Sequence, residues 1–353
     1  MLSPDELVAV AQREGIVALV DWRFQQAVRE FTNIQTKDAS AIPPGVIKAF
    51  TSAAREETLV SMVIEGESRR VLGLIAKAGL SGLLLKGSAL AYWAYPEQHL
   101  RACSDVDLLL PSRDAAEQLS DRLTAEGFER DEPSGDLVAY ELLCRRSMFD
   151  DWQMEIDIHW RLANSPLFAN AFTFDELMAE SIALPNLASN ARGLGPVHAL
   201  MHACVHRALN LSIGVGDKLK WQYDVEVLRA NFTLVDWHRL IDLSVLKGLA
   251  GVVKNALENA AETFETQLPD AWIIALANAE SMEILDARRL SEWRYMQLMT
   301  FKSLPTAFLK LQWLWQRLFP SLDDLRLLYG SHYKSYCHLI FLRFLQLFKL
   351  LKR

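Results

Sequence analysis

Asp105 and Asp107 are the two side chains in this sequence whose spacing most directly suggests chemistry. They lie in the segment 104–110, whose composition favours a β-strand. Because successive side chains of a strand alternate between its two faces, both carboxylates point the same way, roughly 6–7 Å apart along the strand. Two negative charges at this separation repel each other, so the pattern predicts a cation as their partner.

A third carboxylate is available on a later segment, residues 152–161. Apolar and polar residues alternate strictly there, which predicts a strand with one face on a core and the other lining a cleft or solvent. The polar face carries Asp157 and His159. We therefore expect Asp157 to complete a three-carboxylate metal site with Asp105 and Asp107.

An anion-binding turn is predicted upstream of these aspartates. Residues 83–85 are typical of a short buried strand, and Gly87-Ser88 of a turn that opens a helix at 89–95. Such a turn leaves backbone N–H groups free at the positive end of the helix dipole, where they can hold a phosphate.

These segments resemble the nucleotidyltransferase superfamily with the DNA-polymerase-β-like fold, whose signature is an apolar-Gly-Ser turn, then Asp-x-Asp, then a third Asp on a later strand. The chain is more similar still to the bacterial group described as uncharacterised nucleotidyltransferases, by motif over about residues 80–162. The matching motifs are Leu85-Lys86-Gly87, Arg101, Asp105-Val106-Asp107-Leu108-Leu109 and Asp157-Ile158-His159-Trp160.

The resemblance implies metal-dependent transfer of a nucleoside monophosphate from a nucleoside triphosphate, with ATP expected, to an acceptor hydroxyl, with release of pyrophosphate. Mg²⁺ or Mn²⁺ held by Asp105, Asp107 and Asp157 would neutralise charge on the attacking and leaving oxygens. The competing class is a catalytically silent nucleotide-binding or interaction protein that retains the fold, and the intact carboxylates argue against it.

The same chemistry predicts roles for the residues at and near the anion-binding turn. Backbone N–H groups of Gly87 and Ser88 would hold the phosphates, with Lys86 or Arg101 adding positive charge.

Two residues of the strand at 152–161 would act on the acceptor. Asp157 is placed to take the proton of the acceptor hydroxyl. His159 would orient the acceptor or support Asp157, or it merely caps a polar strand edge.

His206 and Asp224 are candidates for contacting the acceptor, because the helical part resembles a substrate-facing module of the family. His198, His202 and His206 recur at four-residue spacing and would share one helix face, but no Glu-x-x-His motif accompanies them, so we do not favour a metal site there. A buried pair linking two helices is the alternative interpretation of His206 and Asp224.

The elements that position these residues are predicted to form an α+β fold, with a small mixed sheet flanked by N-terminal helices and followed by an all-helical part. The predicted regions are 1–80 (helical), 81–190 (nucleotidyltransferase core), 191–332 (helical, acceptor side) and 333–353 (basic amphipathic helix). Within them we expect helix through much of 4–31, a long helical region at 46–77, helical periodicity over 288–318, and antiparallel strands at 137–144 and 152–160.

Composition limits the partners. The 353 residues are 51% hydrophobic and carry a net charge of −7 without a sustained basic run, so broad nucleic-acid binding is not expected. Four isolated cysteines favour a reducing cytoplasm, and we expect neither a signal peptide nor a membrane span. The basic C-terminal helix would contact a second subunit or an anionic membrane, or pack on its own domain, which we favour.

Overall fold

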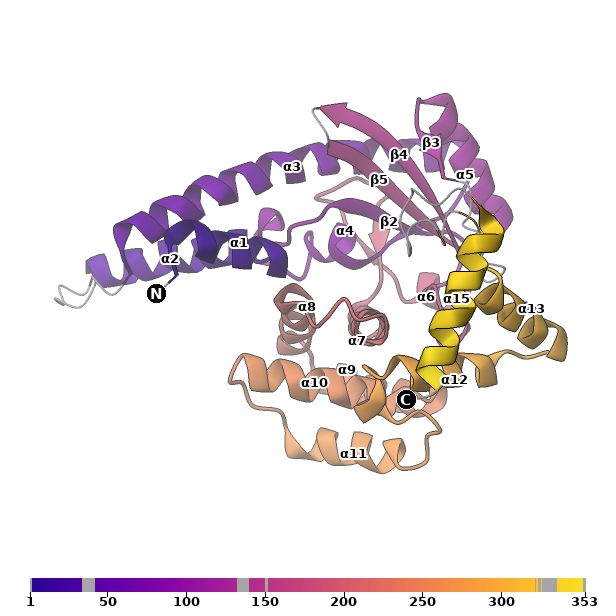
Figure 1. Cartoon of the computed structure of the whole chain (residues 1–353). Helices are drawn as coiled ribbons and strands as arrows, with labels where there is room; N and C mark the ends of the chain where they lie inside the picture. The colour runs from indigo at the N-terminus through magenta and orange to yellow at the C-terminus, as the bar shows by residue number, and fades with distance from the viewer. Residues whose placement is uncertain are drawn as a thin grey trace.

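The computed structural model describes residues 2–33, 42–131, 140–149, 152–320, 322, 325 and 335–351. It shows a mixed sheet between two layers of helices, one formed by the N-terminal half of the chain and the other by the C-terminal half (Figure 1). The predicted α+β fold, with N-terminal helices beside the sheet and an all-helical part after it, is confirmed.

The sheet has seven strands in the order β3-β4-β5-β2-β1-β7-β6. Their bounds are β1 (Leu83–Leu84), β2 (Asp105–Leu109), β3 (Glu129–Arg130), β4 (Glu141–Phe149), β5 (Trp152–His159), β6 (Ile182–Ala183) and β7 (Arg192–Gly193). Strands β4 and β5 are antiparallel neighbours as predicted, although β4 runs later than expected, and residues 137–139 lie outside the described residues. At the centre, β2 is parallel to β5 and antiparallel to β1.

One face of the sheet is apolar and is covered by α3 (Pro44–Lys77) and α5 (Arg113–Ala125). Alternation along β2 and β5 sends to this face side chains with no measurable exposure: Val106, Leu108, Met154, Ile156 and Ile158. Because burial of each such side chain contributes roughly 1.5–3 kcal/mol, a register slip that exchanged the two faces would be strongly disfavoured. The packing of the apolar face therefore fixes which side chains of β2 and β5 lie on the polar face of the sheet.

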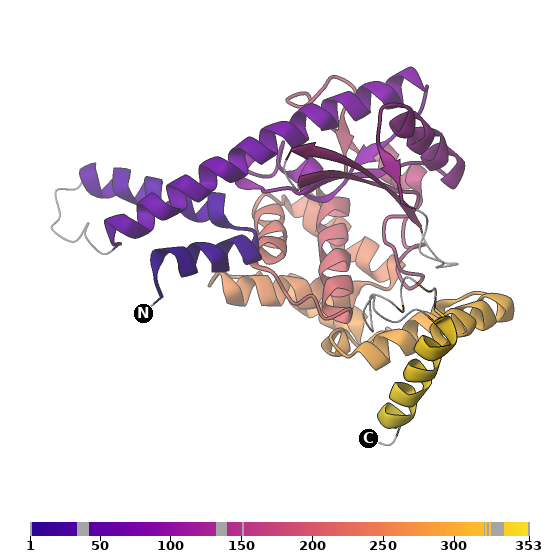
Figure 2. The same cartoon turned by 45° about the horizontal axis from the view of Figure 1, so that its top comes forward.

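The opposite face meets the C-terminal helices, which Figure 2 shows below the sheet. They are α7 (Pro196–Ser212), α8 (Leu219–Ala230), α9 (Leu234–Lys247), α10 (Ala250–Thr263), α11 (Asp270–Glu280), α12 (Trp293–Ser303), α13 (Ala307–Leu318) and α15 (Tyr336–Leu351). One cluster of buried apolar side chains continues from Leu83 and Leu109 of the sheet to Leu200, Val225 and Leu257 of the helices. This shared core holds the helical layer in a fixed position over the polar sheet face.

Helix fills most of two predicted helical segments, 4–31 and 288–318, and each segment is divided by a residue that terminates helices. The segment 4–31 divides into α1 (Pro4–Glu14) and α2 (Val17–Asn33) at Gly15, which has a left-handed φ of 71°. The segment 288–318 divides into α12 and α13 around Pro305, and Thr306 caps the second one by accepting a hydrogen bond from the Leu309 N–H at 3.1 Å.

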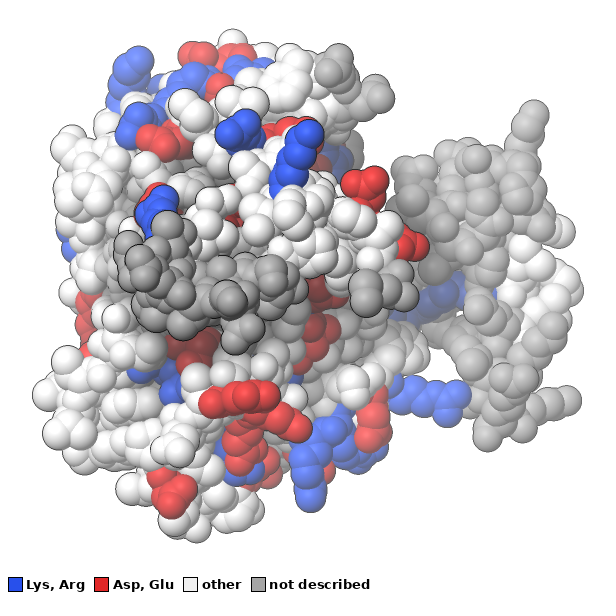
Figure 3. All heavy atoms as spheres, turned by 90° about the vertical axis from the view of Figure 1, so that its left-hand side faces the viewer, with Lys and Arg blue, Asp and Glu red and all other residues white. Residues whose placement is uncertain are grey.

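The remaining described elements are short connections. They are α4 (Lys86–Leu90), α6 (Phe174–Ala179) and the 3₁₀ turns η1 (Gln98–Leu100) and η2 (Ala287–Arg289). No helix within the described ranges is long and apolar enough to cross a membrane. On the face shown in Figure 3, acidic and basic side chains of the described residues are interspersed.

Candidate active site

The two central strands bring the predicted carboxylates together on the polar face of the sheet. In the parallel register of β2 and β5, Asp107 lies opposite Asp157, and Leu109 lies opposite His159. One ligand atom each from Asp107, Asp157 and His159 lie within 4.8 Å of one another. This group could hold a metal ion, because its oxygens and nitrogen converge on one point from a rigid sheet.

Asp105 lies on the same face, opposite Glu155, but it is not a member of this close group. Burial and the charge of Asp107 raise the pKa of the Asp105 carboxyl, while Lys86 and Lys220 oppose the shift. Sequence reasoning did not single out Lys220, a half-buried residue of α8, because nothing local to that helix indicates that it approaches β2.

Lys86 supplies the cation nearest to the carboxylate group. Its Nζ lies 2.6 Å from Oδ1 of Asp107, which is 2% exposed. The backbone of Lys86 is left-handed, with φ at 47°, a conformation that costs a non-glycine residue roughly 1–3 kcal/mol. The strained residue is therefore Lys86 and not Gly87, and α4 begins at Lys86 instead of after the Gly-Ser pair.

The two facing aspartates have opposite electrostatic environments. Burial alone would raise the pKa of Asp107, but Lys86 and His159, whose Nε2 is 3.3 Å from Oδ1, hold it well below its usual range. Burial and the charge of Asp107 raise the pKa of Asp157 to about 7. Asp107 is thus a permanent anion, whereas Asp157 exchanges its proton near neutrality, which is the arrangement expected of a metal ligand beside a proton acceptor.

Gly87 and Ser88 are both buried, and they fasten the α4 turn to β2. The Ser88 hydroxyl donates to the carbonyl oxygen of Asp105 at 3.2 Å and accepts from the N–H of Asp107 at 3.3 Å. A side chain at position 87 would collide with Cys103, since an added Cβ would lie 2.6 Å from its Sγ. Only glycine therefore fits this turn.

Arg101 and Asp224 form a buried ion pair with each other. Nε and Nη2 of Arg101 lie 2.7 and 2.8 Å from the two carboxylate oxygens of Asp224, and the Tyr95 hydroxyl donates to Oδ1 at 2.7 Å. Nη1 of Arg101 donates to the carbonyl of Ala102 at 2.7 Å. In this structure the Arg101 guanidinium therefore binds groups of the protein itself. Asp224 is part of a buried pair, but its partner is Arg101 and not His206.

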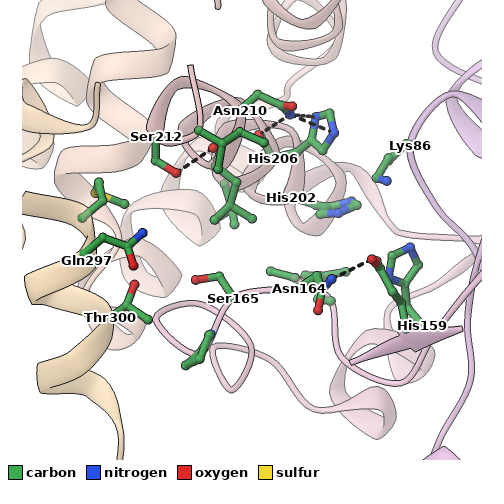
Figure 4. Close-up of a pocket in the computed structure, with 18 of the residues that line it drawn as sticks. Lys86, His159, Asn164, Ser165, His202, His206, Asn210, Ser212, Gln297 and Thr300 are labelled. Carbon is green, nitrogen blue, oxygen red and sulfur yellow. Dashed lines mark hydrogen bonds and ion pairs between the residues drawn. The ribbon is translucent and has the colours of Figure 1, made fainter. Parts of the chain in front are cut away.

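A cleft of about 400 Å³ opens beside the carboxylate group, between the sheet and helices α7, α12 and α13 (Figure 4). Lys86, His159, His202 and His206 lie toward one end of the cleft, and Gln297 and Thr300 of α12 lie toward the other. Other polar lining residues are Glu141, Asn164, Ser165, Asn210, Ser212 and Arg317.

The imidazoles of His202 and His206 are held neutral. Burial, with a contribution from the charge of Lys86, lowers the pKa of His202 to about 3 and lowers that of His206 as well. The His206 ring lies 3.1 Å from the amide nitrogen of Asn210. A neutral His206 can accept from or donate to a substrate hydroxyl, whereas Asp224 does not line this cleft.

Comparison with known proteins identifies a family. A family model described as uncharacterised nucleotidyltransferase matches residues 2–265. No curated protein matches the chain. The matched range contains the carboxylate group, Lys86 and the helices as far as α10, and it ends before α11, α12, α13 and α15.

Proposed function

This chain belongs to the uncharacterised nucleotidyltransferase family, and from that premise we propose that it transfers a nucleoside monophosphate from a nucleoside triphosphate, with ATP expected, to an acceptor hydroxyl. The reaction would depend on Mg²⁺ or Mn²⁺ and release pyrophosphate. The observation that carries the proposal is the convergence of Asp107, Asp157 and Lys86 beside a cleft large enough for a small molecule, which Lys86 and His159 line.

The donor set fits a hard divalent cation. Asp107 and Asp157, with Asp105 beside them, would hold it, and a bound metal would neutralise charge on the attacking and leaving oxygens. Imidazole is a poorer ligand than carboxylate for Mg²⁺. We therefore assign His159 to orienting Asp107 through the 3.3 Å contact of its Nε2.

Lys86 is assigned to the phosphates of the nucleotide. In the structure its ammonium neutralises Asp107, with which it shares a 2.6 Å contact. Lysine has four rotatable bonds in its stem and makes a flexible point charge, so the ammonium can leave Asp107 for a phosphate oxygen. Gly87 and Ser88 would fix the position of this lysine by binding the turn to β2.

Asp157 is assigned as the group that accepts the proton of the acceptor hydroxyl. A carboxyl whose pKa is about 7 gains a proton readily at neutral pH, and Asp157 lies in one group with Asp107 and His159, of which His159 lines the cleft. His206 and the neutral amides of the cleft would orient the acceptor. Asp224 and Arg101 would act at a distance, by joining α8 to the segment before β2.

The four cysteines add an inference about the compartment. All are free thiols, and Cys144 and Cys204 are buried, which is the usage expected in a reducing cytoplasm.

Calorimetry with a nucleoside triphosphate tests the metal bridge. Without a cation, the phosphates would meet Asp105 and Asp107 directly, so binding is expected to be much tighter with Mg²⁺ or Mn²⁺ than in chelator. Asp107→Asn should weaken the metal dependence, whereas Asp242→Asn, on an exposed position of α9, should not. Equally tight binding in chelator would show that no metal ion bridges the nucleotide and the carboxylates.

A further inference from the structure

Positive charge is concentrated at the C-terminal end of the chain. Residues 293–353 contain ten Lys and Arg but only two Asp and Glu, in a chain whose net charge is −7. This basic region follows the range matched by the family model, which ends at residue 265. Such a charge asymmetry indicates a partner of opposite sign that is separate from the nucleotide site.

Helix α13 in this basic region carries an exposed apolar stripe. Phe308, Leu311 and Trp315 are 66%, 66% and 63% exposed, and Leu318 is 38% exposed. Their spacing of three, four and three residues places them on one face of the helix. Trp313 lies on another face, where it is buried and lines the cleft. Among the described residues, α13 therefore packs on the cleft through the opposite face, although Trp315 of the stripe lies against Phe319, with ring centroids 4.4 Å apart.

Two basic residues of α13 lie on its flank between this stripe and the buried face. Lys310 and Arg317 are seven residues apart, their cationic groups lie over the rings of Phe301 and Trp313, and Arg317 also lines the cleft. Helix α15 meets the end of α13, where Arg343 donates to the carbonyl of Arg317 at 3.0 Å, and its own Phe341 is 58% exposed. An aromatic stripe beside cations is the pattern of a helix that lies in a membrane interface.

We propose that the α13 stripe docks the protein on an anionic phospholipid membrane. A lipid surface accepts both parts of the pattern, since acyl chains take up the apolar side chains while phosphate headgroups pair with the cations. A second copy docked through the same stripe would bring two basic surfaces together. Nucleic acid would leave Phe308, Leu311 and Trp315 against a polar backbone.

Flotation of the full chain with vesicles tests this proposal. Vesicles of phosphatidylcholine mixed with phosphatidylglycerol are expected to carry the protein, those of phosphatidylcholine alone are not, and raised salt is expected to weaken the binding. The double variant Phe308→Ser, Leu311→Ser should lower vesicle binding by roughly tenfold or more. Its matched control is Leu234→Ser, Val235→Ser, which removes two side chains that are 72% and 75% exposed on α9.

Three outcomes would overturn the proposal. They are failure to bind anionic vesicles, equal binding to both vesicle types, and an equal loss in the control variant. Equilibrium sedimentation gives a further check, because a dimer that the Phe308→Ser, Leu311→Ser variant dissociates would assign the stripe to a second copy. Thermal melting shows that each variant is folded, and metal-dependent nucleotide binding of the double variant is expected to equal that of the wild type.

Discussion

Two carboxylates from neighbouring strands differ in charge state because of what touches each one. Asp107 is paired with Lys86 at 2.6 Å and lies 3.3 Å from Nε2 of His159, whereas burial beside an anion raises the pKa of Asp157 to about 7. The sequence predicted both residues from strand alternation, together with Lys86 and His159. It did not predict which carboxylate Lys86 neutralises, because that contact depends on the left-handed backbone at position 86.

Asp157→Asn is expected to change stability in a pH-dependent direction. The folded-state pKa of Asp157 is raised from 3.8 to about 7, so the folded protein binds the proton more tightly than the unfolded chain does, and stability falls as pH rises through that window. Asparagine cannot ionise, so the variant should melt above wild type at pH 8 and near it at pH 4. Melting curves across this range check the prediction, and a variant less stable at pH 8 would make Asp157 a structural residue.

Lys86→Met removes the counter-ion of Asp107. Because an unpaired buried charge remains, the variant should lose about 3–5 kcal/mol of stability in the absence of metal. Lysine and metal compete for the same carboxylate, so Mn²⁺ should restore more stability to the variant than it adds to wild type. Denaturant unfolding with and without Mn²⁺ measures both effects, and an unchanged response to Mn²⁺ would separate Lys86 from the metal site.

At the scale of elements, the predictions from the sequence agree with the structure where a segment has a clear local pattern. Strands β2 and β5 have an evident period of two, so their polar faces could be predicted, and the antiparallel pairing of β4 with β5 is confirmed. Strands β3, β6 and β7 have two residues each, which is too short for any period. Gly15 and Pro305 divide two predicted helical segments, because a glycine with a left-handed φ and a proline both end helices.

The ion pair between Arg101 and Asp224 joins residues 123 positions apart, which local patterns do not reveal. We expect Asp224→Asn to cost about 3–5 kcal/mol, because it leaves the Arg101 charge buried without its partner. Arg101→Met with Asp224→Leu should recover much of that loss and keep metal-dependent nucleotide binding. Double-mutant unfolding experiments measure the coupling. If the stable double variant fails to bind nucleotide, Arg101 belongs at the phosphates after all.

At the scale of the whole molecule, the helical layer closes the cleft over the sheet. Asn164, Asn210, Gln297 and Trp313 reach the cleft from separate parts of the chain, so sequence reasoning could not group them. The core that runs from Leu83 to Leu257 sets this arrangement, and long-range packing of this kind leaves no motif. Of the proposed regions 1–80, 81–190, 191–332 and 333–353, the second and third both contribute residues to the cleft, whereas none of the described residues of the first or the last lines it.

Removal of the residues after Tyr333 should leave metal-dependent nucleotide binding unchanged. The carboxylate group and Lys86 lie on β2, β5 and α4, and α15 is not among the described elements that line the cleft. Calorimetry on the truncated chain checks this, with thermal melting as the control for folding. A folded truncated protein that no longer binds nucleotide would assign the C-terminal helix to the site.

The most direct test of nucleotidyl transfer follows the phosphates of the nucleotide separately. The protein is incubated with Mg²⁺, a cell extract as the source of acceptor, and each nucleoside triphosphate labelled at either the α- or the γ-phosphate. If the protein transfers a nucleoside monophosphate, the α-label enters a product while the γ-label leaves as pyrophosphate. We also expect Asp157→Asn to lower the rate by roughly two or more orders of magnitude. Transfer of γ-label to the product would contradict nucleotidyl transfer. Tight metal-dependent binding of nucleotides without turnover would also contradict it and would identify a silent binding protein.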